Sequence, residues 1–186
     1  MKTLPRPARP ALALVAALAI ASPVLADHHA MAEDGATVAA MKLADGTDVG
    51  TVTFTQTEHG VVMAVAVKGL PAGKHGLHIH QTGACTPDFM AAGGHFNPAA
   101  KEHGFHAEGG YHVGDLPNLD VAADGTATAE FFVPGLSIHG PANEALPYML
   151  HDEDGAALMI HAATDDYKTM ASSGGRQACG VIVPKG

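Results

Sequence analysis

The sequence predicts an all-β protein with antiparallel strands. Short segments rich in valine, threonine and phenylalanine, which favour strands, alternate with aspartate and glycine clusters that favour tight turns. No segment carries a long apolar repeat with the period of a helix. The candidate strands are residues 37–43, 49–56, 61–67, 127–133, 148–151, 158–161 and 180–183.

The turn sequences give the order of these elements. Ala-Asp-Gly-Thr-Asp at 44–48 and Glu-His-Gly at 58–60 separate the first three segments, so these are expected to form two consecutive hairpins. Similar Asp-Gly turns bound the later strands. Two segments, 81–118 and 162–178, lack a strong pattern and are expected to be long loops, which in compact domains usually carry function.

The N-terminus has the composition of a secretory signal peptide. Three basic residues precede an apolar run at 11–21, and a Val-Leu-Ala tripeptide offers small residues before a cut near Ala26. We therefore expect residues 1–26 to be removed on export, to the periplasm or another site outside the cytoplasm. Residues 27–186 then form one domain, in which 27–35 is a flexible tail. A buried hydrophobic helix is disfavoured because prolines bracket the apolar run.

The charge of the mature chain limits its partners. The whole chain has ten lysines and arginines against nineteen acidic residues, and residues 1–26 carry three of the basic ones and no acidic one. Seven positive and nineteen negative residues remain, a net charge of −12. This charge argues against nucleic acid as a partner and against binding of the mature form to anionic membranes. Arg176 is the only arginine after residue 26.

A group of histidines has the spacing of metal ligands. Gly-Leu-His-Ile-His at 76–80 is typical of a strand end, where side chains at i and i+2 project from one face. His78 and His80 can therefore reach one ion. With the later His161 they form an all-nitrogen set that has room for one more ligand, and such a set suits copper.

The segment 81–118 carries a second set. His95, His103, His112 and Asp115 supply three imidazoles and one carboxylate. This is a closed tetrahedral set suited to zinc, and the ion would order a loop that has little apolar pattern of its own.

The motifs follow one another as in a known family. They are Gly-Leu-His-Ile-His at 76–80, Gly-Gly-His-Phe-Asn-Pro at 93–98, His-Val-Gly-Asp-Leu-Pro-Asn at 112–118, Ala-Leu-Met-Ile-His at 157–161 and Gly-Gly-Arg-Gln-Ala-Cys-Gly-Val-Ile at 174–182. In this order the chain resembles copper/zinc superoxide dismutase, and the bacterial exported type fits best. The resemblance covers nearly all of residues 27–186. It implies an eight-stranded antiparallel Greek-key β-barrel, or sandwich, with two long functional loops.

The resemblance also implies one copper ion and one zinc ion per chain. The copper ligands would be His78, His80, His95 and His161. The zinc ligands would be His95, His103, His112 and Asp115. His95 would then be shared and would bridge the two ions.

Further residues take roles from the same resemblance. Asp165 would join His78 to His103, a contact that fixes ring orientation. Arg176 would guide the superoxide anion to copper. His95 would carry a proton in a cycle in which one superoxide reduces Cu(II) and a second reoxidises Cu(I), which yields dioxygen and hydrogen peroxide.

Cys85 and Cys179 are the two cysteines of the chain. An even count in an exported protein favours a disulfide over a redox or metal pair, and the resemblance independently pairs them. Two free buried thiols are the alternative.

Other functions remain open at this point. One is an exported copper-binding or copper-delivery protein on the same fold, which would typically lack a zinc ligand or the arginine. Another is a zinc hydrolase, which needs a three-ligand zinc with an open water position. The sequence is compatible with a homodimer but identifies no interface.

Cleavage after Ala26 would create one more candidate site. The mature chain would begin Asp27-His28-His29, so that a free amine, two backbone amides and the imidazole of His29 can surround one Cu(II) ion in a plane. A disordered tail with incidental histidines is the alternative.

Overall fold

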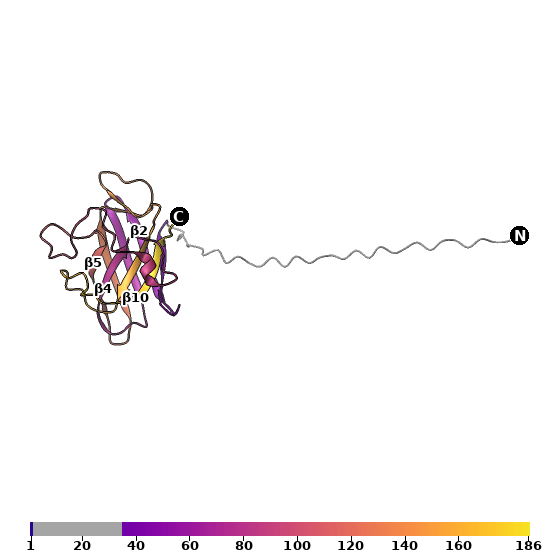
Figure 1. The fold of residues 1–186 in the computed structure, drawn as a ribbon, viewed down its shortest axis with the longest axis horizontal. Helices are drawn as coiled ribbons and strands as arrows, with labels where there is room; N and C mark the ends of the chain where they lie inside the picture. Colours follow the sequence, from indigo (N-terminus) through magenta and orange to yellow (C-terminus); the bar gives the residue numbers. More distant parts are fainter. Residues whose placement is uncertain (2–34) are drawn as a thin grey trace.

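The chain folds into an eight-stranded antiparallel sheet that curls into a nearly closed barrel (Figure 1). A computed structural model describes residue 1 and residues 35–186. The strands are β1 (Thr37–Leu43), β2 (Asp48–Thr57), β3 (Gly60–Val67), β4 (Gly73–His80), β5 (Asp115–Val121), β6 (Ala127–Pro134), β7 (Leu136–Ser137), β8 (Tyr148–Met149), β9 (Ala156–His161) and β10 (Arg176–Val183). A 3-10 helix, η1 (Phe89–Ala92), lies between β4 and β5.

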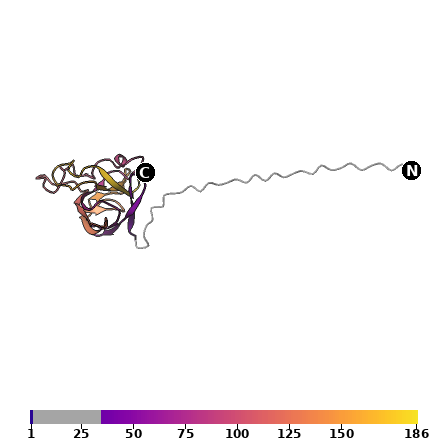
Figure 2. The same ribbon diagram turned by 90° about the horizontal axis from the view of Figure 1, so that it is seen from below.

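The strand order confirms the expected Greek-key architecture. In the barrel the strands follow one another as β5-β4-β9-β10-β1-β2-β3-β6, so β4 and β9, far apart in the chain, are neighbours. β7 and β8 form a separate short pair. Seen along another axis, the strands make a ring and the long loops gather on one side of it (Figure 2).

Several expectations concern residues that lie outside the described part of the chain. These are the signal peptide, except Met1, the tail, except Gly35, and the candidate ligands Asp27, His28 and His29. They stay predictions. In the described residues, no helix is long and apolar enough to cross a membrane.

The first two hairpins form where the turn sequences place them. β1 and β2 pair antiparallel, and β2 pairs with β3 in continuous register from Gly50 opposite Val67 to Thr57 opposite Gly60. Gly60 has a φ of 155°, and a Cβ there would lie 2.2 Å from the carbonyl oxygen of Val133 on β6. Only glycine therefore fits at this turn.

The expected loop over 81–118 was wrong at its C-terminal end, because β5 already begins at Asp115. The sequence did not indicate this strand because it contains Pro117 and Asn118, and both residue types are depleted in strands. β5 is an end strand of the sheet, where a proline can be placed without losing a ladder hydrogen bond.

The second expected loop, 162–178, also ends early. β10 begins at Arg176, which pairs with His161 on β9. The candidate strand at 148–151 is shorter than expected, because β8 spans two residues.

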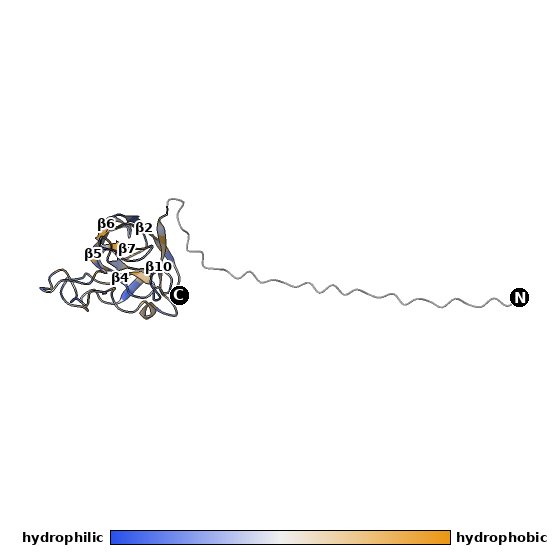
Figure 3. Cartoon of the chain, turned by 90° about the horizontal axis from the view of Figure 1, so that it is seen from above, coloured by the Kyte–Doolittle hydropathy of each residue, from blue (hydrophilic) through white to orange (hydrophobic). Residues whose placement is uncertain are grey.

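β4 is buried on both faces, which positions the histidines. Leu77 and Ile79 belong to the main hydrophobic core inside the barrel. His78 and His80 alternate with them and project from the opposite face, yet both are buried as well. The hydropathy view shows a blue, hydrophilic stretch at β4, near strands that carry orange, hydrophobic stretches (Figure 3). The outer face of β4 is therefore a polar site covered by loops.

The expected disulfide between Cys85 and Cys179 is present. It links the segment before η1 to β10 across a sequence separation of 94 residues. In the chain-entropy model, closing a loop of this length stabilises the fold by about 4 to 5 kcal/mol. Cys179 packs in a second, smaller apolar cluster with Met159 and Ala92. The bridge therefore fixes the start of the long loop to the barrel.

Candidate metal centre

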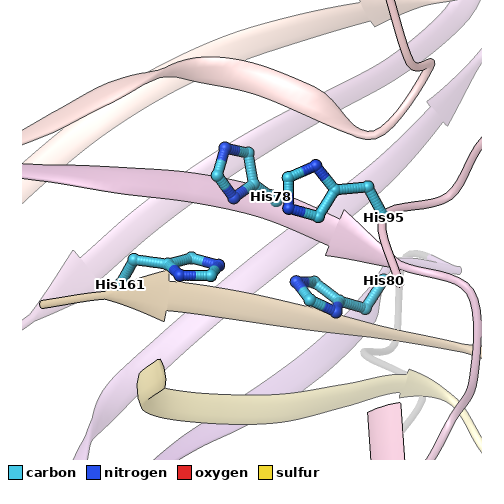
Figure 4. A group of neighbouring side chains, drawn as sticks. All are labelled: His78, His80, His95 and His161. Atoms are coloured by element: carbon cyan, nitrogen blue, oxygen red, sulfur yellow. The ribbon is translucent and has the colours of Figure 1, made fainter. Parts of the chain in front are cut away.

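Three histidine rings on β4 and β9 face one another on the outer side of the barrel. His78 and His80 project from one face of β4, and His161 ends the neighbouring strand β9 (Figure 4). One nitrogen of each ring donates to an oxygen atom. The pairs are His78 Nε2 with Asp165 Oδ2 at 2.7 Å, His80 Nδ1 with the carbonyl oxygen of Gly93 at 3.0 Å, and His161 Nδ1 with the carbonyl oxygen of Gly174 at 3.3 Å.

The second nitrogen of each ring has no hydrogen-bond partner. Among the described residues, His78 Nδ1, His80 Nε2 and His161 Nε2 are the buried side-chain polar atoms in this condition. Buried polar atoms nearly always have a partner, so three such atoms in one cluster require an explanation. Because an oxygen fixes the N–H on the other side of each ring, each of these nitrogens carries a lone pair. That is the form in which histidine binds a metal ion.

The protonation state of these rings agrees with a ligand role. Burial lowers the pKa of His80 to about 2 and that of His161 to about 3. Burial also lowers the pKa of His78, although the neighbouring Asp165 carboxylate opposes this effect. All three rings are therefore neutral near neutral pH, and an imidazole ring that is protonated on both nitrogens cannot bind a metal ion.

His95 joins this cluster from the loop. Its backbone forms an isolated bridge with His80, and its ring stacks on His78 with the centroids 3.9 Å apart (Figure 4). On its other side, His95 Nδ1 lies 2.8 Å from Asp115 Oδ1. His95 thus belongs to two groups of residues, and within each group the possible ligand atoms all lie within 4.8 Å of one another. These groups are His78, His80, His95 and His161, and His95, His103, His112 and Asp115.

The second group converges on Asp115. The Nδ1 atoms of His95, His103 and His112 lie 2.8, 3.2 and 3.3 Å from Asp115 Oδ1, and His95 Nδ1 lies 3.3 Å from His112 Nδ1. With bonds of 2.0 to 2.1 Å, neighbouring ligand atoms in a tetrahedral zinc site are about 3.3 Å apart. The spacing therefore fits zinc.

The carboxylate of Asp115 is held in place and ionised. Its Oδ2 accepts the backbone N–H of Gly104 at 2.8 Å and that of His112 at 3.1 Å, which leaves Oδ1 to face the three rings. Burial alone would raise the pKa of Asp115, but hydrogen bonds from His95 and Gly104 outweigh burial and lower it to about 2.

Asp165, for which the family resemblance implies a link between His78 and His103, contacts one ring in each group. Its Oδ2 contacts His78 Nε2 at 2.7 Å and its Oδ1 contacts His103 Nε2 at 3.2 Å. Burial opposes ionisation, but the hydrogen bonds from His78, the Tyr167 N–H and the Ser172 hydroxyl hold the pKa of Asp165 well below its usual value. One buried anion therefore orients a ring in each group.

Arg176 lies at the edge of the His78, His80 and His161 cluster. Its guanidinium donates to the carbonyl oxygens of Phe89 and Gly93. The same Gly93 oxygen accepts from His80 Nδ1. Because the Gly93 oxygen contacts both His80 and Arg176, the positive charge of Arg176 lies close to the ring nitrogens that have no hydrogen-bond partner.

Two parts of this centre could not be found from the sequence. The carbonyl oxygen of Gly93 orients both His80 and Arg176, and a backbone oxygen leaves no side-chain signal. Tyr167 contacts the loop that carries His103, but one tyrosine in a polar segment forms no pattern.

The chain matches one family model and is similar to proteins of that family over most of its length. The family model for copper/zinc superoxide dismutase matches residues 49–182. A superoxide dismutase [Cu-Zn] of Caulobacter vibrioides is 45% identical over 148 residues, which cover 77% of this chain and 83% of that protein. A superoxide dismutase [Cu-Zn] of Haemophilus parainfluenzae is 38% identical over 148 residues, 73% of each chain.

Solved structures give the same result. A superoxide dismutase-like protein from Bacillus subtilis aligns with a TM-score of 0.70 and 37% identity, over 78% of this chain and 97% of that one. The Cu/Zn superoxide dismutase of Brucella abortus aligns with a TM-score of 0.63 and 31% identity, over 79% of this chain and 99% of that one.

Proposed function

Because this chain belongs to the copper/zinc superoxide dismutase family, we propose that it converts superoxide by a Cu(II)/Cu(I) cycle. Copper would be held by His78, His80, His95 and His161, and zinc by His95, His103, His112 and Asp115. Family membership makes the protein an oxidoreductase that dismutates superoxide and uses copper and zinc. The copper cycle and the assignment of residues to each metal are the proposal.

The three unpartnered ring nitrogens support the copper assignment. His78 Nδ1, His80 Nε2 and His161 Nε2 offer lone pairs at one place, and an all-imidazole set favours copper. His95 would complete this set. The group around Asp115 supplies three nitrogens and one charged oxygen, which would complete the four-ligand set of a structural zinc ion and would leave no position for substrate. Redox chemistry is therefore assigned to the first group and a structural role to the second.

Bound copper supplies a one-electron couple that oxidises one superoxide to dioxygen and reduces a second, with two protons, to hydrogen peroxide. The chain supplies position, charge and a proton. With Nδ1 directed to Asp115, His95 presents Nε2 to the copper group, and this nitrogen can hold a proton between the two half-reactions. Asp165 keeps His78 and His103 in fixed orientations while this occurs.

Arg176 is assigned to the binding of the substrate anion. A mature chain of net charge −12 repels superoxide at long range, so the protein needs a local positive field at the copper group. Arg176 supplies it beside His80, through the shared carbonyl oxygen of Gly93.

A reconstitution experiment separates this enzyme from a copper-delivery protein on the same fold. Metal-free protein is loaded with zinc alone or with zinc and copper, and metal content and superoxide dismutation are measured on each sample. We expect one zinc and one copper per chain, and activity in the copper-containing sample alone. A sample that holds both metals and has no activity above that of the zinc-only sample would support copper delivery instead.

We also propose export to the periplasm with cleavage near Ala26. The basic, apolar and small-residue segments at the N-terminus support this proposal. The intact mass of protein recovered from the periplasm should correspond to residues 27–186, and a full-length mass would contradict it.

A further inference from the structure

Tyr167 lies where three parts of the chain meet. We use the name zinc loop for residues 99–114, which carry His103 and His112. The carbonyl oxygen of Tyr167 accepts the backbone N–H of His106 at 3.0 Å. The ring of Tyr167 packs against the ring of Phe105, with the centroids 5.1 Å apart. These contacts join Tyr167 to the zinc loop directly after the proposed ligand His103.

The hydroxyl of Tyr167 reaches β5. It accepts both the backbone N–H and the Nδ2–H of Asn118, each at 2.8 Å. Asn118 in turn accepts the backbone N–H of Asp165 at 2.9 Å and donates to the Asp165 carbonyl oxygen at 2.9 Å. The backbone N–H of Tyr167 donates to Asp165 Oδ1 at 2.8 Å. Tyr167 and Asn118 therefore hold both the backbone and the carboxylate of Asp165.

A second route leads from Tyr167 to the zinc group. A Cβ at Gly104 would lie 2.0 Å from the Tyr167 carbonyl oxygen, so the two backbones are in direct contact. The N–H of the same Gly104 donates to Asp115 Oδ2 at 2.8 Å. Tyr167 thus supports the peptide group that orients the carboxylate ligand.

The backbone of Tyr167 is held in an uncommon conformation. Its φ is 58°, in the left-handed region that residues with a side chain rarely adopt. Such a conformation persists where the surrounding contacts require it, and here the N–H, the carbonyl oxygen and the hydroxyl are all engaged.

From these contacts we infer that Tyr167 is a positioning residue, which fastens the zinc loop to β5 and Asp165 and thereby increases the affinity for zinc. It need not touch the ion. It acts through Gly104 on Asp115 and through Asp165 on His103. The inference rests on the proposed zinc group.

The test compares two substitutions that each remove one hydroxyl from the same aromatic cluster. Tyr167→Phe takes the acceptor away from the two Asn118 donors and keeps the ring. Tyr111→Phe is the matched control, because Tyr111 also packs against Phe105, with the centroids 4.8 Å apart, but its side chain is exposed. Zinc affinity is measured on metal-free protein by competition with a chelator, and thermal unfolding of the metal-free form is recorded in parallel.

We expect Tyr167→Phe to raise the zinc dissociation constant by roughly 10-fold, the lower end of the effect usual when a group that orients a metal ligand is removed. Tyr111→Phe should stay within twofold of wild type, and the metal-free forms should unfold at similar temperatures. The inference would be overturned if Tyr167→Phe bound zinc as tightly as wild type, or if Tyr111→Phe lost as much zinc affinity as Tyr167→Phe. It would also be overturned if the metal-free Tyr167→Phe protein were destabilised by as much free energy as its zinc binding lost. Two other results would instead overturn the proposed zinc group. One is that the wild-type protein binds no zinc, and the other is that the His112→Ala variant binds zinc as tightly as wild type.

Discussion

Replacing His161 with alanine is expected to abolish superoxide dismutation while one zinc ion per chain stays bound. His161 Nε2 is one of the three unpartnered nitrogens of the proposed copper group, and His161 is absent from the group around Asp115. Removing a group that only hydrogen-bonds to a metal ligand already lowers metal affinity or activity by roughly 10- to 100-fold. Removing a ligand itself should therefore lower activity by more than about 100-fold. Copper and zinc content and dismutation are measured on the reconstituted variant.

The matched control is His151→Ala, which removes an exposed histidine between β8 and β9. It should keep both metals and full activity. If His161→Ala retained copper and activity as His151→Ala does, His161 would not be a copper ligand. Loss of zinc together with copper would show that the two groups are not separate in the way their geometry suggests.

Reversing the charge of Arg176 is expected to have the next largest effect. Electrostatic attraction accelerates the capture of charged substrates by roughly 10- to 1000-fold, and Arg176 is the one arginine of residues 27–186, which carry a net charge of −12. Arg176→Ala should therefore lower activity by about 10-fold at low salt, and Arg176→Glu should lower it further because it repels the anion. Copper content should not change, since the guanidinium donates to carbonyl oxygens and not to the copper group.

The salt dependence of activity distinguishes attraction from a packing defect. Wild-type activity should fall as ionic strength rises, because salt screens the attraction, and both variants should lose much of this dependence. Lys168→Ala serves as the control, since Lys168 is an exposed cation in the loop that precedes Arg176 and should change activity far less. Equal activity of wild type, Arg176→Ala and Arg176→Glu at low salt would rule out the steering role.

The parts of the fold that follow from neighbouring residues could be predicted from the sequence. β1, β2 and β3 lie within one residue of the expected segments, because strand-forming residues and turn sequences act locally there. β5 could not be placed, because Pro117 and Asn118 are poor strand formers and the strand exists through pairing with β4, where His78 stands opposite Asp115.

The site shows the same division. Residue types and spacing were enough to propose the histidines and Asp115 as ligands, whereas Asp165 was implied by the family resemblance alone. Spacing alone could not show that His95 faces both groups, which depends on its stacking against His78 and its contact with Asp115. Nor could it show the roles of the Gly93 oxygen and Tyr167, because their contacts join segments that are far apart in the chain.

Anomalous X-ray scattering from crystals of the fully loaded protein, recorded at the copper and zinc absorption edges, tests the central claim most directly. The account predicts one copper peak among His78 Nδ1, His80 Nε2, His161 Nε2 and His95, and one zinc peak among the Nδ1 atoms of His95, His103 and His112 and Asp115 Oδ1. His95 should contact both. A copper peak outside the first group, one metal occupying both positions, or His95 bound to neither ion would contradict it.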